Sequence, residues 1–160
     1  MRRDLQQVID LANGLGSIKF GAAMDDIEDF LGRPDEEEYI DPDTKSAASW
    51  SYKRLKLHLT FFDFPVVPGA KDRLPLRVVS FLTGHESATL WGARIVGLRK
   101  QELLRLFDEH DCTGFTAPAD ELAGSGYETL RLDDRRITLD LHNGVLKRMQ
   151  WGYVHEPKTA

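Results

Sequence analysis

The sequence has a single cysteine, Cys112, and no long run of apolar residues. One thiol excludes an internal disulfide and any zinc site built on several cysteines. No stretch approaches the ~20 apolar residues that a membrane-spanning helix needs. The two arginines near the start precede no apolar core of the kind found in signal peptides, and no cysteine there could carry a lipid. We therefore expect a cytoplasmic protein with no membrane partner.

Positive charge is also scarce, because 21 Lys and Arg residues face 26 Asp and Glu residues and leave a net charge of −5. Domains that bind nucleic acid are usually basic, so we expect no nucleic-acid partner. Hydrophobic residues make up 41% of the 160 positions, which is ordinary for a globular chain. A chain of this length can bury a sizeable core, so the sequence predicts a folded, soluble protein.

Motifs for metal binding and catalysis are equally rare. The Asp41-x-Asp43 pair lacks the Gly and Glu of a calcium loop, whose positions are held here by Ser46 and Tyr52. Cys112 stands two residues from a histidine, a spacing at which side chains do not face each other on a helix. None of the five histidines has the spacing of a metal-ligand motif: His58, His85, His110, His142 and His155. The sequence thus predicts no catalytic residue, no metal and no cofactor, and a protein that is not an enzyme.

Helical spacing of apolar residues occurs in three segments. The first predicts a helix over 3–12 that stops at Asn13-Gly14. The second predicts a short acidic helix that ends at Gly32-Arg33-Pro34, and the third a stronger helix in the second half. The apolar positions are Leu5, Val8, Ile9 and Ala12, then Ile27, Phe30 and Leu31, then Leu103, Leu104, Leu106 and Phe107.

Alternation with a period of two predicts strands that each bury one face. Residues 35–48 are polar and are expected to be irregular. Asn143-Gly144 is a strong signal for a hairpin. The alternating residues are Trp50 and Tyr52, Leu57, Leu59 and Phe61, Val79 and Phe81, residues 127–132, Ile137, Leu139 and Leu141, and residues 146–153.

The two halves of the chain can be aligned with each other. At an offset of 76 residues, Gly16 meets Gly92 and Ile27 meets Leu103, although any two amphipathic stretches could be aligned in this way. The alignment predicts an α+β fold of two tandem repeats. Each repeat has short helices and an antiparallel meander of three to four strands, with the helices on one face of a continuous sheet and the other face open. Residues 1–90 would form the N-terminal helix and first repeat, and 91–160 the second repeat and a frayed tail, in one compact unit.

The order of these motifs resembles a known group of proteins. Ile18-Lys19-Phe20-Gly21 precedes the helix that ends at Leu31, and Gly32-Arg33-Pro34 and Trp50-Ser51-Tyr52 follow it. The pattern is similar to the repeat of the β-lactamase-inhibitor-protein-like (BLIP-like) fold and to the single-repeat module of the small outer-membrane assembly lipoproteins. The resemblance covers roughly residues 16–153 as two copies. It implies a non-catalytic protein that grips a partner with the open sheet face and adjoining loops.

Negative charge is concentrated in one segment. Residues 25–43 hold ten acids and one base, Arg33, which is a net charge of −9, while the rest of the chain is 20 − 16 = +4. Such a cluster steers a basic partner and raises the association rate, or it is a solvated surface that keeps the protein soluble. The candidate partner-binding acids are Asp35, Glu36, Glu37, Glu38, Asp41 and Asp43.

Four further residues are candidates for partner binding. Phe62 and Trp91 fall outside the inward-facing pattern, and an aromatic side chain on an open sheet is a common anchor for a protein partner. His58 and His142 lie on the polar side of their strands and could share the open face as partner contacts, or as a metal or acid–base pair.

Three functional hypotheses follow from the sequence. The first is a cytoplasmic protein-binding module, an inhibitor or immunity-type protein whose acidic segment meets a basic partner surface. The alternative is a small-ligand-binding protein or minor enzyme with a cavity between the repeats that uses His58, His142 or Asp140. The third is an open face that pairs with itself, so the protein would be either a monomer or a homodimer.

Overall fold

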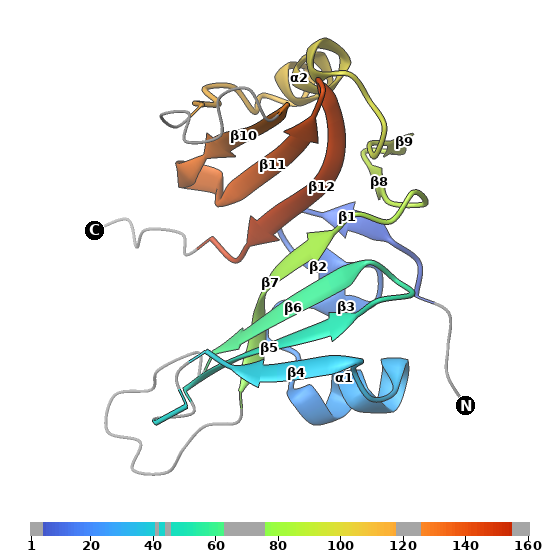
Figure 1. Ribbon diagram of the computed structural model, residues 1–160, viewed down its shortest axis with the longest axis vertical. Helices are drawn as coiled ribbons and strands as arrows, with labels where there is room; N and C mark the ends of the chain where they lie inside the picture. Colours follow the sequence, from blue (N-terminus) through green and yellow to red (C-terminus); the bar gives the residue numbers. More distant parts are fainter. Residues whose placement is uncertain (1–4, 41, 44–45, 63–75, 118–125, 155–160) are drawn as a thin grey trace.

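The computed structural model describes residues 5–40, 42–43, 46–62, 76–117 and 126–154 (Figure 1). It contains two α-helices, α1 (Met24–Leu31) and α2 (Lys100–Glu109), and a short 3-10 helix, η1 (Asp133–Arg135). The strands in these residues are β1 (Val8–Asp10), β2 (Gly14–Leu15), β3 (Ile18–Lys19), β4 (Glu36–Tyr39), β5 (Ala47–Tyr52), β6 (Leu57–Phe62), β7 (Arg77–Thr83), β8 (Thr89–Leu90), β9 (Ala93–Arg94), β10 (Tyr127–Leu132), β11 (Ile137–His142) and β12 (Val145–Gly152).

A seven-stranded antiparallel sheet dominates the structure, in the order β10-β11-β12-β7-β6-β5-β4. Strands β4 to β7 form one meander and β10 to β12 another. Pairing of β12 with β7 joins the two meanders, with Trp151 opposite Phe81. The alternating residues of β6 and β11 are buried as predicted, because one face of the sheet packs on the core. The Asn143-Gly144 hairpin is also confirmed, since both residues adopt the positive φ that such a turn requires.

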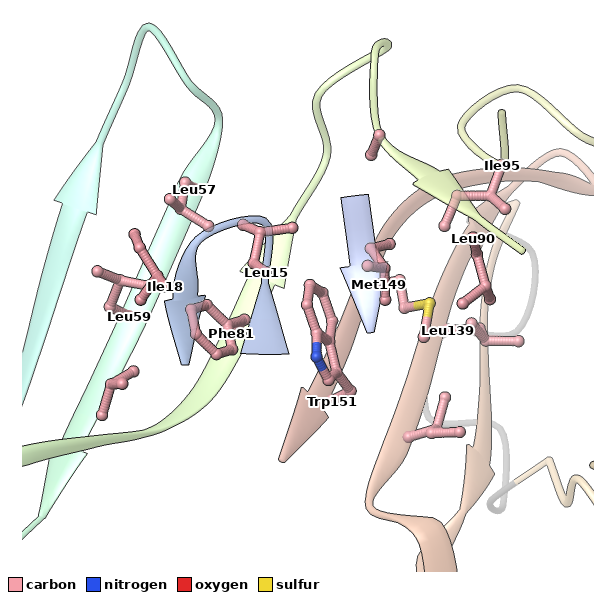
Figure 2. Packing of buried hydrophobic residues seen from close by; sticks show 14 of the residues in the cluster. Leu15, Ile18, Leu57, Leu59, Phe81, Leu90, Ile95, Leu139, Met149 and Trp151 are labelled. Carbon is pink, nitrogen blue, oxygen red and sulfur yellow. The ribbon is translucent and has the colours of Figure 1, made fainter. Parts of the chain in front are cut away.

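A small five-stranded sheet covers the buried face of the large one. Its order is β3-β2-β1-β8-β9, and β1 pairs in parallel with β8. Leu15 of β2 and Ile18 of β3 pack beside Phe81 and Trp151 of the large sheet (Figure 2). The indole Nε1 of Trp151 donates a hydrogen bond to the Gly14 carbonyl oxygen at 3.2 Å, so one buried side chain joins the two sheets.

A buried polar contact also ties the N-terminal segment to the large sheet. The Gln7 amide donates to the Leu55 carbonyl oxygen at 2.8 Å and accepts a hydrogen bond from the Thr83 hydroxyl. Both Gln7 and Thr83 are buried, so each needs this partner to offset the loss of water.

The helix predicted over 3–12 is wrong for residues 5–12, and residues 3 and 4 lie outside the described part of the chain. Residues 8–10 form β1, in which Val8 is 49% exposed and Ile9 only 4%. The segment whose apolar residues have helical spacing therefore contains a short strand. Its backbone N–H and C=O groups bond to β2 and β8 instead of forming helical hydrogen bonds.

The predicted fold class is wrong as well. Strands make up 45% of the described residues and helices 17%, and the strands form two sheets of five and seven. The structure is a sheet-dominated fold and does not consist of two repeats with helices lying on one face of a sheet. The reason is that β1, β2, β3, β8 and β9 are too short to show periodicity in the sequence, yet together they cover the centre of the large sheet.

The other two predicted helices are confirmed. Helix α1 buries Ile27 and Leu31, and α2 buries Leu103 and Phe107. Asp25 and Asp26 lie in the first turn of α1, where the helix dipole favours negative charge. In the described residues, we find no helix with the length and apolar character needed to cross a membrane.

Candidate functional site

The face of the seven-stranded sheet opposite the core carries several of the candidate residues, and we call it the open face. Strand register aligns its side chains in rows across the sheet. One row runs from Glu36 through Ser51, His58 and Leu82 to Gln150. The next runs through Glu38, Ser49, Thr60 and Ser80. The centre of the open face is thus rich in hydroxyl groups.

An acidic edge, formed by Glu36, Glu37 and Glu38, borders this face. These residues lie on β4, the last strand of the sheet, although residues 35–48 were predicted to be irregular. Pairing with β5 holds them extended, with Glu36 opposite Ser51 and Glu37 opposite Trp50. Glu36 and Glu38 therefore project onto the open face, and Glu37 projects to the other side.

The charge of the acidic edge is only partly balanced. Lys53 Nζ lies 3.2 Å from Glu36 Oε1, in an exposed ion pair. Glu37 and Glu38 form no ion pair with another described residue, and all three glutamates are exposed. Because exposed ion pairs contribute little to stability, these charges are available to a partner at little cost to the fold.

The remaining acids of the predicted segment lie at its two ends. Asp35 accepts a hydrogen bond from the Lys53 backbone at 2.6 Å, which anchors the beginning of β4 to the turn after β5. Asp43 is exposed beyond the end of β4. Asp41 lies outside the described residues.

Exposed apolar side chains adjoin the acidic edge at the far end of β4. Phe62 on β6 is 42% exposed and Ile40 is 56% exposed. Ala47 lies between them, because its carbonyl oxygen accepts a hydrogen bond from Ile40 and it pairs with Phe62. Phe62 also lines a groove of about 380 Å³ with Thr60 and Ser80. The predicted position of Phe62 on the open face therefore agrees with the structure.

The structure separates the two candidate histidines. His58 lies on β6 and His142 at the end of β11, with β7 and β12 between their strands. The His58 ring accepts or donates a 2.8 Å hydrogen bond with the Ser51 hydroxyl, whereas the His142 ring stacks on Tyr127 at 4.3 Å. They share the open face, but they do not form a pair.

Asp140, the third residue of the alternative hypothesis, is engaged by its neighbours. Arg148 Nε lies 2.7 Å from its carboxylate, and Thr129 donates a hydrogen bond to it at 3.2 Å. Among the described residues, no three histidine, cysteine or carboxylate side chains group together as metal ligands would.

Trp91 lies away from the open face. It occupies the turn between β8 and β9, in the small sheet that covers the core side. Its ring stacks on His110 at 3.9 Å and meets Phe107 edge-on at 5.3 Å. Trp91 therefore does not lie on the open face with Phe62, because its exposure reflects a turn position and not a place on the large sheet.

Cys112 is buried at 4% exposure, as expected of a lone structural thiol. Burial raises the pKa of the Cys112 thiol and so disfavours the reactive thiolate. The thiol lies on the core side of the large sheet and takes no part in the open face.

Sequence reasoning missed a second part of the open face. Leu82, Lys147 and Arg148 line a groove of about 690 Å³ together with His58. Lys147 and Arg148 are exposed cations within a strand that is otherwise largely buried, a local signal that could have drawn attention to them. Their proximity to His58 follows only from the pairing of β12 with β7.

Comparison with protein-family models and with curated proteins finds no match. Among solved structures, the chain is similar to an extracellular protein containing an SCP domain from Bacillus anthracis str. Ames, with a TM-score of 0.44 and 11% sequence identity. The similarity covers 83% of this chain and 43% of the other, so this chain spans less than half of that protein's length. A likeness this low assigns neither a family nor an activity.

Proposed function

We propose that this chain is a non-catalytic protein-binding module of the inhibitor or immunity type, which captures a partner with a basic surface. The observation that carries the proposal is the position of the acidic edge. Its three adjacent glutamates lie on the outermost strand of the large sheet, exposed and mostly unpaired. No described strand pairs with the outer edge of β4, so a basic segment laid along it would gain both charge pairs and backbone hydrogen bonds.

Exposed apolar side chains beside the acidic edge support the same proposal. Phe62 and Ile40 offer a partner a small apolar anchor, while the glutamates supply orientation and a fast encounter. The same glutamates oppose the pairing of two copies through β4, because like charges would face each other across the new strand pair. The edge therefore favours a different chain over a second copy of this one.

Neutralising the acidic edge tests this function. In the variant Glu36→Gln/Glu37→Gln/Glu38→Gln, each lost charge pair is worth about 0.2–1 kcal/mol. Three pairs at about 0.5 kcal/mol each give about 1.5 kcal/mol, or about tenfold weaker binding. The matched control is Asp25→Asn/Asp26→Asn/Asp29→Asn, which removes the same charge from exposed positions of α1.

The measurement starts from affinity capture in lysate of the native host at low and physiological salt, followed by calorimetry with the purified captured protein. We expect a basic protein that the wild type and the α1 variant bind equally and the β4 variant binds about tenfold more weakly. Equal affinities of the β4 and α1 variants would refute the role of the acidic edge. Capture of no protein at either salt concentration would count against the binding function itself.

A further inference from the structure

A groove of about 690 Å³ crosses the open face beside the acidic edge. Strands β4, β5, β6, β7 and β12 each contribute lining residues, and the loops next to them supply the rest, so the groove runs across five neighbouring strands. Four inter-strand spacings of about 4.8 Å give a length of about 19 Å, which matches about six extended residues. A groove this long and open suits a segment of chain better than a compact small molecule, which would be largely enclosed.

Cations stand at both ends of this groove. Lys53, which follows β5, lies toward one end, and Lys147 and Arg148 lie at the other, on β12. Lys56 precedes β6 and lies between them, where its carbonyl oxygen accepts a hydrogen bond from Gly84. Two carboxylates, Glu36 and Glu86, also line the groove, so the formal charge of its lining is 4 − 2 = +2 with His58 neutral.

The carboxylates of the groove are already matched. Lys53 lies 3.2 Å from Glu36, and Lys56 lies 3.3 Å from Glu86. Arg148 is paired with Asp140 at 2.7 Å, whereas Lys147 forms no ion pair with another described residue. The surplus positive charge is therefore concentrated at Lys147, and the exposed ion pairs of Lys53 and Lys56 can exchange partners at little cost.

Between the two charged ends, the floor of the groove has both apolar and polar side chains. Leu82 and Val96 are half-buried and give it apolar surface. Because His58 uses Nδ1 in its contact with Ser51, its Nε2 is left to meet a ligand. At Gly84, an added Cβ would lie 2.9 Å from the Lys147 carbonyl oxygen, so glycine lets the β12 main chain approach closely there.

We propose that this groove binds an extended acidic segment of the partner protein, with carboxylates at the two ends and apolar side chains between them. The acidic ends would meet Lys53 on one side and Lys147 on the other, with Lys56 between them, and the apolar centre would rest on Leu82 and Val96. The proposal rests on the proposed function, because Glu36 belongs to both the groove and the acidic edge. Together the two surfaces select a partner that carries a basic patch next to an acidic segment, which fixes its orientation.

A fluorescein-labelled, end-blocked hexapeptide, Glu-Asp-Leu-Val-Asp-Glu, is the probe for this groove, and fluorescence anisotropy is the readout. We expect saturable binding below about 1 mM that weakens as salt rises from about 0.05 to 0.3 M. The peptide Glu-Asp-Ser-Ser-Asp-Glu should bind severalfold more weakly, since it lacks the apolar centre. The reversed-charge peptide Lys-Lys-Leu-Val-Lys-Lys should not occupy the groove.

Two pairs of substitutions with the same charge change locate the binding. Lys53→Gln/Lys147→Gln should weaken peptide binding about tenfold. Arg94→Gln/Arg105→Gln, which neutralises two exposed cations outside the groove, should change it by less than about twofold. Leu82→Thr should weaken binding of the apolar-centred peptide and leave the serine peptide unaffected, a pattern that a general loss of charge would not produce.

Several results would overturn the proposal. The first is the absence of saturable binding, and the second is equal loss in the groove and control variants. Displacement of the peptide by citrate at equal concentration would make the groove a site for small anions. A dimer in light scattering that the peptide dissociates would assign it to the acidic segment of a second copy. The variant Glu37→Gln/Glu38→Gln changes only residues of the acidic edge that do not line the groove, so it should keep peptide binding. Failure of the groove and failure of the acidic edge can therefore be told apart.

Discussion

Replacing Trp151 by Phe tests the contact that joins the two sheets. The Trp151 side chain is fully buried, stacks on Phe81 at 5.4 Å and donates its indole hydrogen bond to the Gly14 carbonyl oxygen. Phenylalanine fills most of the same space without steric conflict, but it cannot donate this hydrogen bond. The buried Gly14 carbonyl oxygen would then lack this donor, so the loss is larger than the change in size alone.

The expected cost has three parts. The smaller ring loses about 1 kcal/mol of burial, and a cavity of about 40 Å³ at about 24 cal/mol per Å³ adds about 1 kcal/mol. The lost hydrogen bond contributes about 1 kcal/mol more. The free energy of unfolding should therefore fall by about 3 kcal/mol, and the melting temperature of a chain of this size by about 6–12 °C.

The assay is urea unfolding followed by far-ultraviolet circular dichroism, which does not depend on tryptophan fluorescence. Trp91→Phe is the matched control, because Trp91 is 37% exposed and a phenylalanine ring can still stack on His110. We expect this control to lose less than about 1 kcal/mol, with the urea dependence unchanged in both variants. Equal losses in the two variants would show that the small sheet does not pack on Trp151 as described.

Three further predictions concern buried and charged groups. Thr83→Val should lower the free energy of unfolding by about 1–3 kcal/mol in urea titrations, because it removes the donor to the buried Gln7 amide. Since burial raises the Cys112 pKa, iodoacetamide should alkylate the native thiol far more slowly than the unfolded one. The free energy of unfolding should also fall as pH rises above about 8.5, the pKa of an unfolded thiol, because the unfolded thiol then loses its proton while the native one keeps it. Hydrogen bonds from Asn13 hold the Asp10 pKa below its usual value, so stability should fall as pH drops below about 4, measured by acid titration, and Asp10→Asn should reduce that dependence.

Local patterns predicted much of the large sheet and both helices. Alternation in β6 and β11 identifies the residues that face the core, because a strand turns successive side chains to opposite faces whatever its neighbours are. The Asn143-Gly144 turn depends only on the φ angles of its own two residues. The charge count likewise located the acidic edge. It did not predict that this segment is a strand, because a run of glutamates has low strand propensity and pairing with β5 holds it extended.

Only the tertiary structure decided which surfaces meet. The pairing of β1 with β8 joins segments about eighty residues apart, and that of β12 with β7 brings Lys147 next to Leu82. Strand pairing of this kind depends on partners far away in the chain, so no periodicity within a segment reveals it. The sequence by itself therefore determined which residues are buried in the longer strands and where the negative charge gathers. The small sheet over the core, the separation of His58 from His142, and the groove beside the acidic edge were decided by non-local packing.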